Sequence, residues 1–237
     1  MAGPEGQHHR RRQVQGGQGW TILLGVGATI VLLAAFSVFA AAQGVPFRML
    51  SKDPDAVAGL PPFVGWQAGL CWLIEAFGAT SALLAWYLVR RLDGDRTTRR
   101  FLLGIGLLAG LLLSDDIFQF HEAVYPALFG IPQDLIYPIY AMVLLAIFVA
   151  WGRHVVTEDR TLLVLAGVAF ASSLVLDTFG PKHWEYFNLF EDGTKQLGFT
   201  LWTLFLVRLA VRCVLTAADA RVVEAAAGAE RGLSATR

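Results

Sequence analysis

The residues best suited to chemistry lie close together at positions 114–122, in the string SDDIFQFHE. At about 100° per residue, Asp115 and Glu122 would fall about 20° apart around a helix, and Ser114 and His121 are related by the same step. The predicted face consists of Ser114, Asp115, Phe118, His121, Glu122 and Tyr125. Asp116 is predicted to point away from it. Carboxylates beside an imidazole are a ligand set for divalent metals, and they can also act as general acid and base.

A second polar string, EDGTKQLG, begins at Glu191. Lys195 follows Glu191 by four residues and Asp192 by three, so it can reach either carboxylate on a helix. Asp177 and Glu75 stand in two further apolar segments. An ionisable group at the membrane centre costs about 2.5–3.5 kcal/mol on the insertion scale, so each is a hypothesis of function. The structural alternatives are a stabilising ion pair for Glu191, a helix start for Asp192 and a helix end for Asp177.

The elements that must position these residues are apolar and long. The chain has 237 residues, of which 55% are hydrophobic and 16% charged, with a mean hydropathy of +0.53. A soluble domain usually carries about 25% charged residues. Six apolar segments are near or above the roughly 17–25 residues that cross a bilayer as a helix. They are Thr21–Ala42, Phe63–Val89, Phe101–Tyr125, Leu135–Trp151, Thr161–Phe179 and Phe190–Val214. We predict an all-α bundle of six transmembrane helices over residues 21–215, with a flexible basic tail at 1–20 and a polar tail at 216–237.

The distribution of positive charge predicts the orientation. With the N-terminus inside, 15 of the 19 lysines and arginines fall on the inner side, and only Arg48, Lys52, Lys182 and Lys195 fall outside. Both termini are therefore predicted to be cytoplasmic, with the acidic strings near the opposite surface. Arginine outnumbers lysine 16 to 3, which indicates GC-rich coding and a bacterial source. Together with the apolar segments, this predicts a multi-pass protein of the bacterial inner membrane. The first apolar run is longer than the roughly 7–15 residues of a signal peptide, which favours an uncleaved helix.

The two polar strings carry a family resemblance. Ser114 to Glu122 and Glu191 to Gly198 resemble a class of uncharacterised bacterial multi-pass membrane proteins with a Ser-Leu-Asp-Glu…His-Glu helix and a later Glu-Glu-x-x-Glu-x-x-Gly helix. This chain departs from that pattern at the Asp115-Asp116 pair and at Lys195, which stands where a carboxylate is expected. The resemblance implies a location for the site and no activity. The membrane zinc hydrolases of the alkaline ceramidase and adiponectin-receptor superfamily hold zinc with three histidines, a ligand count that this chain does not meet.

Three classes of function remain open. The first is a metal-dependent membrane enzyme in which Asp115, His121, Glu122 and Glu191 are catalytic and Asp115, His121, Glu122 and Asp192 bind zinc or iron. Its substrate would be lipid-like or in the outer leaflet. The second is a small proton- or ion-coupled carrier that uses Glu75, and the third is a non-catalytic assembly partner. A net charge of zero gives no reason to expect nucleic acid binding, and the oligomeric state is left open.

Overall fold

The computed structural model describes residues 65–152, 159–180 and 187–235, together with short stretches between residues 26 and 61. These residues form helices and turns, with no strand among them. The chain divides into two compact units, Met1–Val64 and Gly65–Arg237. The first unit contains a short apolar helix, Leu33–Ala42. The rest of the first predicted span, and the basic tail, lie mainly outside the described residues.

Five helices of the second unit are long and apolar enough to cross a membrane. They are Trp66–Arg91, Arg96–Phe118, Leu135–Gly152, Arg160–Phe179 and Phe190–Gly228. Its elements in order are α4 (Trp66–Arg91), α5 (Arg96–Phe118), the π-helix η1 (Phe120–Val124), α6 (Tyr125–Phe129), α7 (Gln133–Ile147), the π-helix η2 (Phe148–Gly152), α8 (Arg160–Phe179) and α9 (Phe187–Ala235). The prediction of an all-α fold is therefore confirmed, and five of its helices have the length and apolar composition of membrane spans.

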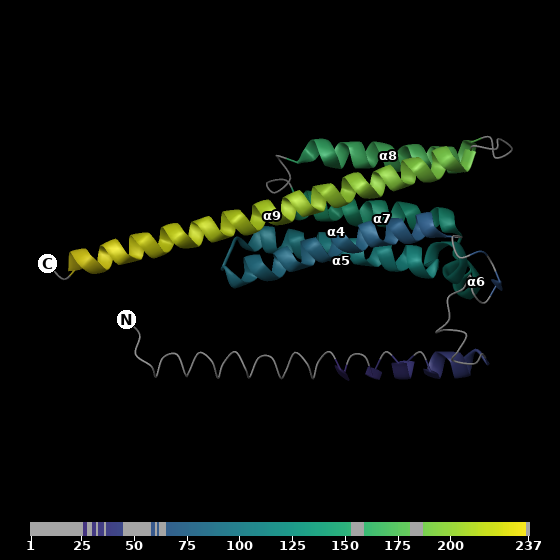
Figure 1. Cartoon of the computed structure of the whole chain (residues 1–237), viewed down its shortest axis with the longest axis horizontal. Helices are drawn as coiled ribbons and strands as arrows, with labels where there is room; N and C mark the ends of the chain where they lie inside the picture. The colour runs from purple at the N-terminus through teal and green to yellow at the C-terminus, as the bar shows by residue number, and fades with distance from the viewer. Residues whose placement is uncertain are drawn as a thin grey trace. The chain divides into compact units, whose positions relative to one another are not determined.

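Helices α4 and α5 form an antiparallel hairpin, and α9 packs along α4 (Figure 1). The turn ends at Asp95, whose carboxylate caps α5 by accepting the Thr98 backbone N–H at 2.8 Å. This hydrogen bond lowers the pKa of Asp95. Small residues let the helices approach closely, because a Cβ placed on Gly78 would lie 2.8 Å from the hydroxyl of Thr203 in α9. The core between them is closed by fully buried Phe101 and Phe205.

Helix α9 is much longer than a membrane crossing requires. Its 49 residues extend about 73 Å at 1.5 Å per residue, against about 30 Å of hydrocarbon. Figure 1 shows its C-terminal half running past the ends of α4 and α5. The residues after Thr216, predicted as a polar tail, continue the same helix to Ala235. Near the start of α8, buried Asp159 ties α8 to α9 through Arg208 and Arg212, at 2.9 and 3.0 Å.

The predicted continuous helix from Phe101 to Tyr125 is wrong beyond Phe118. Gln119 adopts a left-handed conformation with φ of 51°, and a π-helical turn follows. A continuous α-helix would bring the ring of Pro126 against the carbonyl of Glu122, four residues earlier. The Asp115 carboxylate accepts the backbone N–H of His121 at 2.9 Å, which satisfies one of the donors freed by the break. The helical-wheel prediction for this segment therefore fails after Phe118.

Candidate functional site

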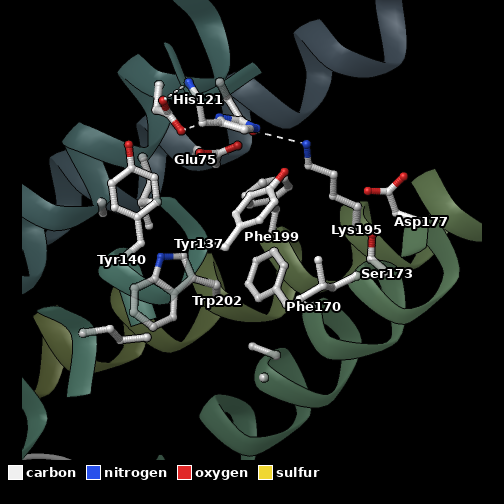
Figure 2. A pocket seen from close by; sticks show the side chains of 18 of the residues that line it. Glu75, His121, Tyr137, Tyr140, Phe170, Ser173, Asp177, Lys195, Phe199 and Trp202 are labelled. Atoms are coloured by element: carbon white, nitrogen blue, oxygen red, sulfur yellow. Dashed lines mark hydrogen bonds and ion pairs between the residues drawn. The ribbon is translucent and has the colours of Figure 1, made fainter. Parts of the chain in front are cut away.

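A cavity of about 600 Å³ lies between α4, α5, η1, α7, α8 and α9. One set of its lining residues is polar: Glu75, Asp115, Asp116, His121, Glu122, Tyr137, Tyr140, Ser173, Asp177, Glu191 and Lys195. The remaining walls are mostly apolar, with Leu112, Leu144, Leu163, Phe170, Phe199 and Trp202 among them. Figure 2 shows Glu75 and His121 toward one end of the cavity and the rings of Trp202 and Phe170 away from them. The cavity is thus amphipathic.

Asp115 and His121 form the most tightly held pair of the site. Both residues are buried, at 2% and 4% exposure. One oxygen of Asp115 lies 2.5 Å from His121 Nδ1, and the other accepts the His121 backbone N–H at 2.9 Å. His121 Nε2 lies 3.4 Å from a carboxylate oxygen of Glu122. A carboxylate that hydrogen-bonds to one ring nitrogen fixes the orientation of the imidazole, so that the other nitrogen can bind a metal or exchange a proton.

Asp116 also belongs to the site, and its predicted outward orientation is wrong. Its carboxylate lines the cavity and lies 3.7 Å from Lys195 Nζ of α9. One potential ligand atom from each of Asp115, Asp116 and His121 lies within 4.8 Å of the others. The break at Gln119 explains this arrangement, because it moves His121 off the regular helical path and back toward the last turn of α5. Three such atoms are sufficient to hold one divalent ion with an open position.

Glu75 is the one charged residue in the predicted span Phe63–Val89, and it shares the cavity with the acids of α5. The hairpin explains why: Glu75 lies 16 residues before the end of α4, and Asp115 lies 19 residues after the start of α5. Both are therefore about 24–29 Å from the turn. Glu75 is 4% exposed, and its Oε1 atom has no hydrogen-bond partner among the described residues. The hydroxyl of Tyr140 is likewise buried, with no hydrogen-bond partner among the described residues.

The remaining predicted residues divide into those that line the cavity and those that do not. Glu122, Glu191 and Asp177 line the cavity together with Lys195. Asp192 is exposed and is not among the lining residues, so the structure gives no support to its role as a metal ligand. Ser114 also lies outside the lining, and its hydroxyl donates to the Gly110 carbonyl of its own helix at 2.8 Å. The acids and bases of the loop at residues 181–186 lie outside the described residues.

Sequence reasoning missed Tyr137, Tyr140 and Ser173. The two tyrosines are three residues apart in α7 and therefore share a face of an otherwise apolar helix. That spacing was a usable signal. The ring of Tyr137 lies 5.2 Å from that of His121, centroid to centroid, and packs beside the Asp115–His121 pair. Ser173 in α8 is buried, and nothing in its surrounding sequence distinguishes it from a serine packed between helices.

Among the described residues that line the cavity, carboxylates outnumber cationic side chains. Among the described lining residues there are six carboxylates: Glu75, Asp115, Asp116, Glu122, Asp177 and Glu191. The cationic side chains are one lysine and, when protonated, one histidine. Several carboxylates held close together in an apolar setting require cations or protons to offset their repulsion. A divalent cation held by carboxylate and imidazole meets that requirement.

Residues 23–209 match the family described as Domain of unknown function (DUF8692). The matched region contains every residue that lines the cavity. Comparison with curated proteins and with solved structures finds no match. Since the matched region covers most of the chain, this protein belongs to the DUF8692 family.

Proposed function

We propose that this protein is a metal-dependent enzyme of the bacterial inner membrane, which hydrolyses a lipid-like substrate near the extracytoplasmic surface. In this proposal the apolar helix of the N-terminal unit is part of a sixth span, and both termini are cytoplasmic. The excess of arginine on the proposed inner side supports that orientation. Asp159 with its arginines stands at the start of α8, whereas Asp177 of the cavity stands near its end, about 27 Å away. This spacing supports a proposed position of the cavity toward the outer side.

The observation that carries the proposal is the cluster of Asp115, Asp116 and His121, with ligand atoms within 4.8 Å of one another in the wall of an amphipathic cavity. These residues would hold one divalent ion, with zinc or iron as the candidates. Such an ion acidifies a bound water and polarises a carbonyl. Asp115 keeps His121 in one orientation, and Tyr137 packs against the imidazole ring.

The other lining residues have roles that follow from their positions. Glu122, beside His121 Nε2, would accept the proton of the attacking water, and Glu191 on the same wall is the second candidate base. Lys195 offsets the charge of Asp116 and would face the oxyanion that develops during hydrolysis. The apolar wall formed by Leu112, Leu144 and other side chains would hold the substrate chain out of water.

The direct test is the metal content of the purified protein. We expect about one divalent ion per chain for the wild type and a large loss for Asp116→Asn and His121→Ala. Asp192→Asn is the matched control, because it removes an exposed acid that does not line the cavity. Thermal unfolding of each variant would separate loss of metal from loss of fold. A wild type that retains no more metal than His121→Ala after loading with zinc or iron would overturn the proposal.

A second candidate function, an ion-coupled carrier, is favoured by Glu75. A buried carboxylate with an unsatisfied oxygen, nine residues into α4 and on a cavity wall, is typical of an ion or proton relay. Reconstituted liposomes under a proton or sodium gradient would show flux that Glu75→Gln abolishes. An enzyme would show no such flux, and its metal would remain bound in this variant.

A further inference from the structure

One oxygen of Glu75 that lacks a hydrogen-bond partner bears on the chemistry of the ligand that the cavity binds. Glu75 is 4% exposed, and its Oε1 atom is buried with no hydrogen-bond partner among the described residues. Leaving a buried acceptor unpaired is unfavourable, and more so for a charged group. Asp116 of α5 and Lys195 of α9 interact with the Glu75 carboxyl, but neither gives Oε1 a hydrogen bond. A hydrogen-bond donor on a bound molecule would satisfy it.

Tyr140 adds a second polar atom in the same condition. Its hydroxyl in α7 is buried and lines the same cavity. Asp115 and Tyr125 interact with it, but no described residue forms a hydrogen bond with it. In Figure 2 the Tyr140 hydroxyl and the Glu75 carboxylate both lie toward the end of the cavity where His121 is found. A carboxylate oxygen accepts hydrogen bonds, and a tyrosine hydroxyl can donate or accept one. Together they fit a head group that donates one hydrogen bond to Glu75 and either donates or accepts a second with Tyr140.

The apolar walls call for a different part of the ligand. The volume of about 600 Å³ equals that of about twenty waters at roughly 30 Å³ each. Along the wall formed by Leu112, Leu144 and Trp202 water would find few hydrogen-bond partners, so an apolar chain suits this part of the cavity better. Gly167 lines this cavity, and a Cβ built on it meets no atom within 4 Å. There is thus open space beside an apolar wall.

We propose that the cavity binds a single-chain amphiphile whose head group carries a hydroxyl or amide N–H, with the Glu75 carboxylate accepting that hydrogen and the chain lying along the apolar wall. This substrate class rests on the function proposed above, since the head group would then lie beside Asp115, Asp116 and His121. Glu75 is a positioning residue in this scheme. It takes no part in holding the metal.

The test measures binding to chelator-treated protein in nanodiscs, so that it does not depend on metal. The first probe is radiolabelled 1-O-hexadecylglycerol, which has two hydroxyls and cannot be hydrolysed. The second is its dimethyl ether, which has the same chain and no donor. We expect the wild type to prefer the first probe by about tenfold or more, as a hydrogen bond to a charged acceptor allows. Glu75→Leu should lose that preference and keep its affinity for the ether, and Glu75→Gln should fall between them.

Gly167→Leu tests the position of the chain, because it adds a side chain where the cavity is open. It should weaken binding of both probes at least tenfold. Gly110→Leu is the matched control: a Cβ there also meets no atom within 4 Å, and Gly110 is not among the lining residues. Equal preference for the two probes in the wild type and in Glu75→Leu would overturn the role of Glu75. Unchanged binding in Gly167→Leu would overturn the placement of the chain. Metal content is unaffected by either result, so failure here is distinguishable from failure of the metal site.

Discussion

Replacing Asp115 tests the part of the site that depends most on one side chain. Its two oxygens hold the His121 ring at 2.5 Å and the His121 backbone N–H at 2.9 Å, and the carboxylate is 2% exposed. A hydrogen bond that involves a charged group contributes about 1.5–3 kcal/mol. Two such bonds share one residue and are not additive, so we expect Asp115→Ala to reduce the free energy of unfolding by about 3 kcal/mol. That corresponds to roughly a hundredfold change in the folding equilibrium.

The neighbouring residue offers the control. The hydroxyl of Ser114 donates only within its own helix, to the Gly110 carbonyl, so Ser114→Ala should change stability by less than about 0.5 kcal/mol. Asp115→Asn retains one acceptor oxygen and should lose about half as much as Asp115→Ala. The assay is SDS-induced unfolding in mixed micelles, followed by tryptophan fluorescence, with chelator present so that no metal contributes. If Asp115→Ala unfolded within 0.5 kcal/mol of the wild type, the pair would not organise this end of the helix.

Three further substitutions test the scaffold. Asp159→Ala breaks a buried contact with two arginines and should cost about 2–4 kcal/mol in the same unfolding assay, at the low end because one arginine is 66% exposed. Asp93→Asn, in an exposed pair at 3.6 Å, should cost less than about 1 kcal/mol, and asparagine is the substitute because Asp93 has a positive φ of 56°. Gly78→Ala places a Cβ 2.8 Å from a side chain of α9 and should lower the melting temperature. The Cβ of Gly69→Ala meets no atom within 4 Å, so this control should leave the melting temperature unchanged. Equal melting temperatures for the two variants would argue against close packing of α4 and α9. Asp95→Ala removes the cap of α5 and should cost about 0.5–2 kcal/mol, with Asp95→Asn near neutral. Because the pKa of Asp95 is lowered in the fold, its contribution should be present above the usual carboxyl pKa and disappear as the pH falls through the lowered value, a dependence that Asp95→Asn should lack.

The sequence by itself was sufficient to find five of the helices and to mark the polar residues. Segments such as Thr161–Phe179 and Leu135–Trp151 match helices within a few residues, because a run of apolar side chains that must enter lipid can satisfy its backbone only as a helix. The cost of placing carboxylates among them identified Glu75, Asp115 and Glu191 before any coordinates were known, and all three line one cavity.

Only the tertiary structure decided how those residues meet. A helical wheel assumes an unbroken helix, and the left-handed Gln119 before Pro126 ends that assumption, which is why His121 returns to Asp115. Asp116 stands before the break, and it faces the cavity because of how α5 is rotated against α9. The contact between Lys195 and Asp116 joins α9 to α5, and the approach of Glu75 to the same wall depends on the register of the α4–α5 hairpin. Helical periodicity predicts which residues lie near one another within about one turn of the same helix. The relative depth and rotation of separate helices follow from how their side chains pack, and no local pattern in the sequence records that.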